Sequence, residues 1–221
     1  MSSTVISHEI HDQVQFSSQK KSLQGELHLP AMATGIVLFV HGSGSSRFSP
    51  RNQFVARRIR QKRIGTLLFD LLTEEEEAID SQTRHLRFDI DLLTQRLIDA
   101  TTWVKRQDET MGLNIGYFGA STGGAAALVA AALLGDSIGA VVSRGGRPDL
   151  AESALSYVKS PTLLIVGGFD EVVIKLNEEA FAQLQCKKEF KIVPGATHLF
   201  EEPGKLEEVA WTTAEWFRRY L

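Results

Sequence analysis

The stretch Asn114-Ile115-Gly116-Tyr117-Phe118-Gly119-Ala120-Ser121-Thr122-Gly123-Gly124 decides the fold. Its first five residues form a short apolar run typical of a buried strand, and an alanine-rich helical pattern begins at residue 122. The Gly-x-Ser-x-Gly pattern between them places small residues two positions before and after the serine, which lets the chain turn sharply. Such a turn lifts the hydroxyl above the sheet at a helix N-terminus, so Ser121 is a candidate nucleophile. A glycine-rich turn with an incidental serine is the alternative.

The same alternation of apolar runs and helical patterns extends along the chain. Runs that are apolar at every position suit strands covered on both faces, as in a parallel sheet. The sequence predicts such strands at residues 35–40, 65–69, 114–118, 138–142, 162–166 and 189–193, and helices at residues 52–62, 88–107, 122–134, 150–158, 173–185 and 205–221. Residues 23–29 alternate instead, which suits an antiparallel hairpin strand near one edge. We therefore expect an α/β fold with a doubly wound, mostly parallel sheet flanked by helices.

Length and composition indicate one domain over residues 1–221, with residues 1–19 as either a flexible terminus or an edge-strand segment. Hydrophobic residues make up 43% of the chain, enough for a full core, and the formal net charge of −3 favours neither nucleic acid nor an anionic membrane as partner. Without a signal-peptide pattern or a membrane-length apolar run, the sequence predicts a cytoplasmic protein. The acidic run at residues 73–77 predicts a solvated loop or a first helical turn, with a metal site as the weak alternative.

The sequence has one cysteine, Cys186, which excludes an intramolecular disulfide. It lies in a polar segment with no nearby base, so we interpret it as a bystander rather than a nucleophile. We expect neither a metal nor a cofactor. The glycine- and serine-rich loop at residues 41–46 could alternatively hold a phosphate, but no Gly-Lys-Ser/Thr ending and no Gly-x-Gly-x-x-Gly motif is present.

Two later loops carry residue types that could activate a serine. In a doubly wound sheet the chemistry lies beyond the carboxyl ends of the strands. His198 follows the strand expected at 189–193 and is the candidate general base, and Asp170 follows the strand at 162–166 and would orient it. The order serine, aspartate, histidine is the one expected for this fold. Asp149 and Glu171 are reserve acids, and Asp170 could instead simply cap the next helix.

A tetrahedral intermediate also needs donors for its oxyanion. One should be the backbone N–H of Thr122, at the start of the helix. The other should come from the loop His41-Gly42-Ser43-Gly44-Ser45-Ser46, where Ser43 is the best candidate and Gly42 allows close approach to a substrate. We expect His41 to support this loop rather than to act in catalysis.

With these pieces placed, the sequence resembles the α/β-hydrolase superfamily, and within it the small dienelactone-hydrolase-like branch. The resemblance covers residues 23–221, and four segments carry it: 41–44, 119–123, 167–173 and 195–200. Residues 142–150 are also similar to hydrolase domains found joined to phosphoribosyltransferases. Dienelactone hydrolases proper use a cysteine nucleophile, whereas this chain has Ser121. That departure favours a generic carboxylic ester or thioester as substrate.

The segment between the expected strands at 138–142 and 162–166 is too short for a helical cap, so we predict no cap domain and an open, shallow site. Arg144 and Arg147 lie at that strand end and could bind a carboxylate or phosphate on the substrate. Alternatively, they pair with Asp149, Glu152 or the acidic loop and hold the crossover in place.

The sequence thus predicts a carboxylesterase-like serine hydrolase that acts on small esters or thioesters through an acyl-enzyme. Two alternatives stay open: an acyltransferase or perhydrolase that uses the same triad, and a non-catalytic binding domain on the same fold. The expected partner is a small-molecule ester or thioester, with no nucleic acid and no membrane. A homodimer is left open.

Overall fold

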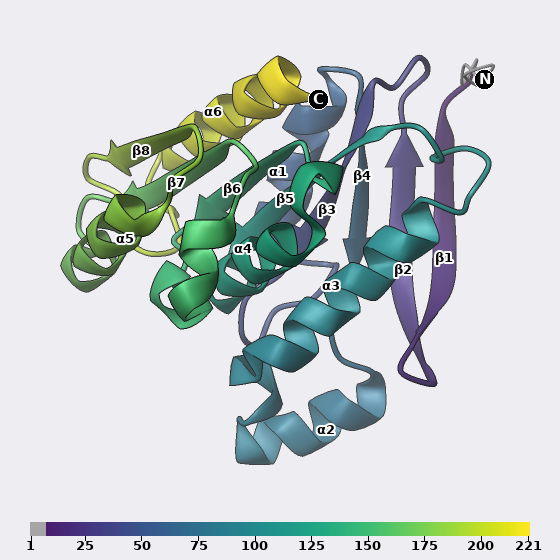
Figure 1. Cartoon of the computed structure of the whole chain (residues 1–221), viewed down its shortest axis with the longest axis horizontal. Helices are drawn as coiled ribbons and strands as arrows, with labels where there is room; N and C mark the ends of the chain where they lie inside the picture. The colour runs from purple at the N-terminus through teal and green to yellow at the C-terminus, as the bar shows by residue number, and fades with distance from the viewer. Residues whose placement is uncertain (1–7) are drawn as a thin grey trace.

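The computed structural model describes residues 8–221, and its centre is one eight-stranded sheet (Figure 1). The strands are β1 (Ile10–Ser18), β2 (Lys21–Leu29), β3 (Gly35–Val40), β4 (Ile64–Phe69), β5 (Asn114–Ala120), β6 (Ala140–Arg144), β7 (Thr162–Gly167) and β8 (Lys188–Val193). Their spatial order is β1-β2-β4-β3-β5-β6-β7-β8. The β1–β2 and β2–β4 pairs are antiparallel, and all other pairs are parallel. The predicted fold class is confirmed.

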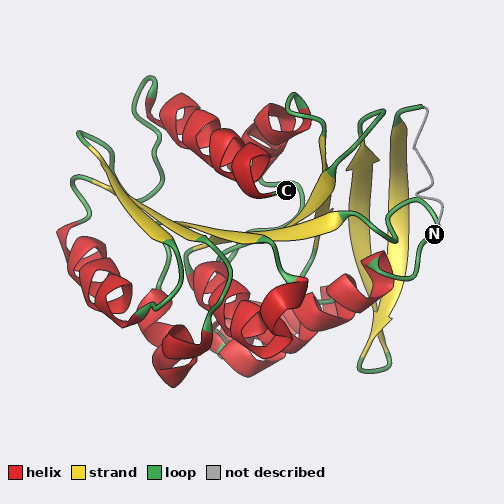
Figure 2. Cartoon of the chain, turned by 45° about the horizontal axis from the view of Figure 1, so that its top comes forward, coloured by secondary structure: helices red, strands yellow, loops and turns green. Residues whose placement is uncertain are grey.

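Helices cover both faces of this sheet (Figure 2). The α-helices are α1 (Pro50–Arg60), α2 (Glu74–Thr83), α3 (Ile90–Val104), α4 (Thr122–Leu134), α5 (Glu171–Gln183) and α6 (Lys205–Tyr220). Short 3-10 helices are η1 (Leu86–Phe88), η2 (Gly135–Ser137) and η3 (Pro148–Tyr157). Helices α1 and α6 pack together over one face, while α3, α4 and α5 cover the other. Every residue of β3, β4, β6 and β7 is buried, as their apolar runs predict.

The two faces of the sheet form two separate apolar clusters. Along β3, Val37 and Phe39 pack in the cluster under α1 and α6, while Ile36 and Leu38 pack in the one under α3 and α4. This alternation follows from the pleat, because successive side chains of a strand point to opposite faces. The carboxyl ends of β3 to β8 therefore meet at one rigid edge, on which the candidate site lies.

The N-terminal hairpin agrees with the alternating pattern of residues 23–29. β1 pairs with β2 along its whole length, from Ile10 opposite Leu29 to Ser18 opposite Lys21, and forms one edge of the sheet. β1 lies within residues 1–19, for which the sequence left a flexible terminus or an edge-strand segment open. The part of that expectation that concerns residues 1–7 lies outside the described residues.

The sequence did not fully predict two of the connections between strands, namely the one that begins α2 and the one between β6 and β7. The acidic run begins α2: the Thr73 hydroxyl accepts a hydrogen bond from the Glu76 N–H, and the Glu76 carboxylate accepts one from the Thr73 N–H. The helix expected at 150–158 is instead the 3-10 helix η3, because Glu152 has φ 47° and ψ −128° and interrupts any regular helix.

Within residues 8–221 no separate cap domain is evident between β6 and β7. None of the described helices combines the length and apolar character that a membrane span requires.

Candidate active site

Ser121 lies at the sharp turn between β5 and α4. Its φ of 51° and ψ of −122° lie in a strained region for a residue with a side chain. Glycines on either side make the turn sterically feasible. A Cβ atom on Gly119 would lie 2.4 Å from the Gly123 carbonyl oxygen, and one on Gly123 would lie 2.1 Å from the Val40 carbonyl oxygen. The Gly-x-Ser-x-Gly pattern is therefore required by the packing of β5, α4 and β3.

The segment after β6 holds this strained turn in place. The Ser121 N–H donates to the Arg144 carbonyl at 3.3 Å, and the Ser121 carbonyl accepts from the N–H groups of Arg147 at 3.1 Å and Gly124 at 3.0 Å. Hydrogen bonds on both sides of the residue fix its conformation. The serine is therefore rigidly presented at the carboxyl edge of the sheet.

His198 and Asp170 meet beside this turn. His198 Nδ1 lies 2.6 Å from Asp170 Oδ2. Asp170 occupies the N-cap position of α5, yet its side chain makes no capping hydrogen bond. The capping alternative for Asp170 is therefore not what the structure contains, and its carboxylate is free to accept from His198.

Gly145 places the histidine close to the serine turn. A Cβ on Gly145 would lie 3.4 Å from His198 Cε1 and 3.5 Å from Nδ1, so the imidazole ring packs directly on this residue. The preceding residue, Arg144, accepts the hydrogen bond from the Ser121 N–H. The structure thus brings Asp170 and His198 into contact. Ser121 is connected to them through the backbone of Arg144 and Gly145.

The loop after β3 lies against the same turn. A Cβ on Gly42 would lie 3.0 Å from Ser121 Cβ and from the Ala120 carbonyl oxygen. Ser43 Oγ and Thr122 Oγ1 are 3.2 Å apart. Among the described residues, the backbone N–H groups of Ser43 and Thr122 have no acceptor. Two free amides therefore flank Ser121, as an oxyanion site requires.

His41 supports this loop through both ring nitrogens. Its Nε2 accepts a hydrogen bond from the Leu71 N–H at 3.1 Å, and its Nδ1 lies 3.0 Å from the Gly42 carbonyl, to which it donates. Burial lowers the pKa of His41 to about 4, although the Gly42 carbonyl acts in the opposite direction. The ring is therefore neutral at pH 7 and fixed in one tautomer, which agrees with the expected structural role.

The two arginines after β6 have different surroundings. Arg147 Nε and Nη2 donate to Asp149 Oδ1 and Oδ2 at 2.8 and 2.7 Å, so this arginine adopts the pairing alternative. Arg144 is buried, and its guanidinium donates to none of the described residues. The sequence did not distinguish the two, because both follow the same strand.

The remaining titratable residues weighed from the sequence are engaged elsewhere. His11 and His28 stack on each other in the β1–β2 hairpin, where each contacts a glutamate, and His85 bonds the Thr83 hydroxyl. No group of three potential ligands in residues 8–221 has the arrangement of a metal site. Cys186 has one weak contact, 3.7 Å from Thr162 Oγ1.

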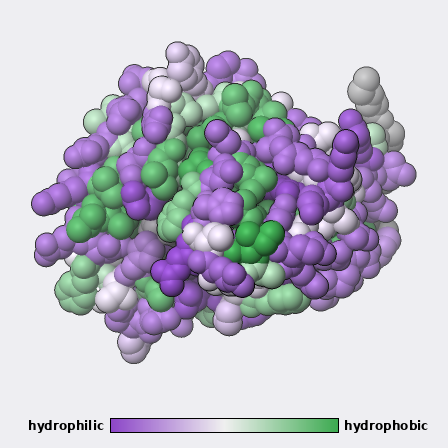
Figure 3. Space-filling view, turned by 90° about the horizontal axis from the view of Figure 1, so that it is seen from below, coloured by the Kyte–Doolittle hydropathy of each residue, from purple (hydrophilic) through white to green (hydrophobic). Residues whose placement is uncertain are grey.

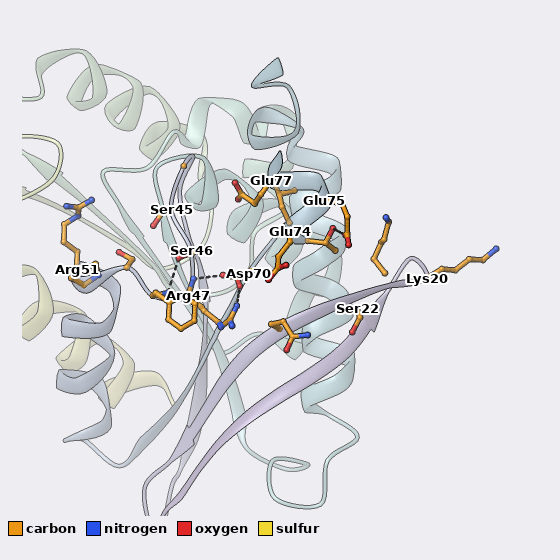
Figure 4. A pocket seen from close by; sticks show the side chains of 18 residues that line it. Lys20, Ser22, Ser45, Ser46, Arg47, Arg51, Asp70, Glu74, Glu75 and Glu77 are labelled. Carbon is orange, nitrogen blue, oxygen red and sulfur yellow. Dashed lines mark hydrogen bonds and ion pairs between the residues drawn. The ribbon is translucent and has the colours of Figure 1, made fainter. Parts of the chain in front are cut away.

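The sequence did not predict the cavity beside the loop that follows β3, residues 41–46, which we call the oxyanion loop. A cavity of about 1120 Å³ extends from Gly44 and the start of α1 to the β1–β2 hairpin and the start of α2. Figure 4 shows Arg47 paired with Asp70 in its middle, Arg51 on one side, and three glutamates at α2 on the other. Ser121, Asp170 and His198 do not line it, so it is a neighbour of the candidate site.

The fold and this geometry define an α/β hydrolase. The family model described as "Dienelactone hydrolase family" matches residues 56–221, and the chain belongs to that family. A dienelactone hydrolase from Anabaena variabilis is 58% identical, with a TM-score of 0.94 over 97% of this chain and 99% of that one. Est1E from Butyrivibrio proteoclasticus has a TM-score of 0.79 over 94% of this chain and 98% of its own, but at 16% identity it supports the fold alone.

A longer protein is also similar in sequence. A Mycobacterium tuberculosis protein named "Putative phosphoribosyl transferase" is 53% identical over 210 residues. The match covers 95% of this chain and 46% of that protein. The chain therefore spans about half the length of the curated relatives that it matches.

Proposed function

We propose that this chain is a serine hydrolase that cleaves small carboxylic esters or thioesters through an acyl-enzyme. The contact between His198 Nδ1 and Asp170 Oδ2, close to the strained Ser121, is the observation that carries the proposal. Because Asp170 engages Nδ1, the other ring nitrogen, Nε2, is left to exchange a proton with the serine.

The reaction then has two halves. Ser121 Oγ attacks the carbonyl carbon as His198 Nε2 takes the hydroxyl proton, and the N–H groups of Ser43 and Thr122 hold the resulting oxyanion. Collapse of this intermediate breaks the ester or thioester bond, and His198 returns the proton to the leaving alcohol or thiol. A water molecule, deprotonated by His198 Nε2, then attacks the acyl carbon. The bond between the acyl carbon and Ser121 Oγ breaks, His198 returns the proton to that oxygen, and the acid is released.

The surface around the pair supports small substrates with an apolar group. Phe169 and Val172, on either side of Asp170, are 70% and 72% exposed, and Leu199, next to His198, is 39% exposed. Figure 3, a view from below, shows apolar patches between hydrophilic side chains. Exposed apolar side chains beside a catalytic pair favour an apolar acyl or alcohol group lying across an open surface.

The direct test is turnover of p-nitrophenyl acetate and butyrate by the wild type and by Ser121→Ala. Removal of the nucleophile should lower kcat by several orders of magnitude, roughly 10⁶-fold at the extreme. Equal rates would contradict the proposal. Failure of a fluorophosphonate probe to label Ser121 in folded protein would favour a non-catalytic domain, and a panel of acyl acceptors would reveal acyl transfer or perhydrolysis.

A further inference from the structure

Arg144 is a buried cation without a counter-ion. It is the last residue of β6, and the residue is 7% exposed. Its Nε and Nη1 atoms are buried, and no described residue accepts a hydrogen bond from the guanidinium. A buried charge is costly unless a partner of opposite sign compensates it, so a solitary arginine here needs an explanation.

The surroundings of Arg144 add positive charge. Its guanidinium lies 5.8 Å from the centre of the Phe118 ring, whose face compensates the charge only in part. Burial lowers the pKa of Arg144 to about 10, and the charge of Arg51 acts in the same direction. Arg144 is therefore protonated at pH 7 and is repelled by its cationic neighbour.

Arg51 lies in the first turn of α1, and it forms an ion pair with the exposed Glu201. Its Nη1 donates to Glu201 at 2.9 Å, while its Nε is buried without a partner. In Figure 4 its side chain extends away from Asp70 and the glutamates of α2. The α1 N-terminus adds about half a positive charge to the region. With Arg144, the sum is about one and a half positive charges, close to the 1.5 to 2 negative charges of a phosphate group at pH 7.

We propose that Arg144 is the base of a phosphate subsite between the end of β6 and the first turn of α1. This phosphate subsite rests on the proposed function in one respect, namely that the reaction occurs at Ser121. The Arg144 carbonyl accepts from the Ser121 N–H and Gly145 packs on His198, so a phosphate bound by the Arg144 side chain would lie within one side-chain length of the Ser121 turn. The favoured substrates are then esters or thioesters that carry a phosphate group. Guanidinium groups bind phosphate oxygens through paired hydrogen bonds, which gives the subsite its selectivity.

Calorimetry with inorganic phosphate tests the subsite without catalysis. Titrations at constant ionic strength would use the wild type, Ser121→Ala, Arg144→Met and Arg58→Met. Arg58 is a half-buried α1 arginine that donates to Gln61, and its loss changes the net charge equally. We expect the wild type, Ser121→Ala and Arg58→Met to bind phosphate with the same affinity, and Arg144→Met to bind at least tenfold more weakly. Equal binding by Arg144→Met, or no millimolar binding by the wild type, would overturn the proposal.

Two further measurements separate the alternatives. Phosphate should compete with p-nitrophenyl acetate, with an inhibition constant at least tenfold higher in Arg144→Met, whereas acetate should inhibit far less. Equal inhibition by acetate would refute the assignment to phosphate. Arg144→Lys, which keeps the charge but loses the planar fork, should bind with intermediate affinity. Arg144-dependent phosphate binding without ester turnover would refute the proposed function alone, and Ser121-dependent turnover without phosphate binding would refute the subsite alone.

Discussion

His198 Nδ1 lies 2.6 Å from Asp170 Oδ2, although 28 positions of sequence separate the two residues. The whole of α5 and β8 lies between them. They meet because β7 and β8 are parallel neighbours whose carboxyl ends share one edge of the sheet. The Asp170 carboxylate makes no helix cap, so it is free to accept a hydrogen bond from the imidazole, as the proposed reaction requires.

Asp170→Asn should lower kcat for p-nitrophenyl acetate by about 10³- to 10⁴-fold with little change in KM, because an amide cannot stabilise the imidazolium. Asp149→Asn is the matched control. It removes a carboxylate that follows β6 but is paired with Arg147, and it should change kcat by less than about threefold. A smaller loss in Asp170→Asn than in the control would show that another acid serves His198.

Gly42→Ala tests the approach of the oxyanion loop to the nucleophile. The added Cβ would lie 3.0 Å from both Ser121 Cβ and the Ala120 carbonyl oxygen, so the loop must shift by a few tenths of an ångström. We expect kcat to fall by about tenfold or more, because oxyanion donors act only when accurately placed.

Gly135→Ala is the control for this loop. Gly135 has φ 53° and ψ −125° and open space around its α-carbon, so alanine there should cost about 1 to 3 kcal/mol of stability and leave kcat unchanged. Full activity in Gly42→Ala would place the oxyanion donors elsewhere.

The free energy of unfolding should decrease as the pH falls below 6.5, because His41 is buried in its neutral form. Burial lowers its folded-state pKa to about 4 from the ordinary 6.5, so below pH 6.5 the unfolded chain binds a proton that the folded protein does not. Its contribution to stability is fully present above pH 6.5 and is lost as the pH falls to about 4, at most about 3 kcal/mol. Denaturant unfolding of the wild type and His41→Gln across this range would show the difference, and the exposed His85→Gln should keep the wild-type slope. Parallel slopes in the wild type and His41→Gln would contradict this account.

Two buried arginines should respond in opposite directions to the same substitution. Arg144→Met removes an uncompensated charge and should stabilise the protein by about 1 to 4 kcal/mol in phosphate-free buffer. Arg96 donates to the Ser18 carbonyl at 3.2 Å and to Glu76 at 2.8 Å. Arg96→Met leaves that carboxylate without its partner and should destabilise by about 3 kcal/mol. Thermal unfolding of both variants measures the contrast, and a destabilised Arg144→Met would mean that the wild type has a compensating group.

Local patterns sufficed to predict the sheet and the Ser121 turn. Continuous apolar runs mark strands that are buried on both faces, and the glycines at 119 and 123 are required by contacts that any such turn makes. The positions of Asp170 and His198 followed because parallel strands direct their carboxyl ends to one edge. The family resemblance is confirmed by the family model.

Features that depend on distant contacts were not predictable. The sequence could not show that Glu152 would take a positive φ and convert the expected helix to η3. It also could not show that Arg147 would find Asp149 while Arg144 would find no partner. Burial and pairing of a long side chain depend on which elements pack over it, and that is decided by the whole fold.

The compact η3 crossover has a kinetic consequence. Because it connects β6 to β7 without a domain that must swing aside, the approach of substrate and the departure of product need no large rearrangement. Turnover should then be governed by the bond-making steps at Ser121, and kcat should be insensitive to added sucrose or other viscogens. An open site does not exclude bulk water. That is compatible with the proposed reaction, because water is needed to hydrolyse the acyl-enzyme.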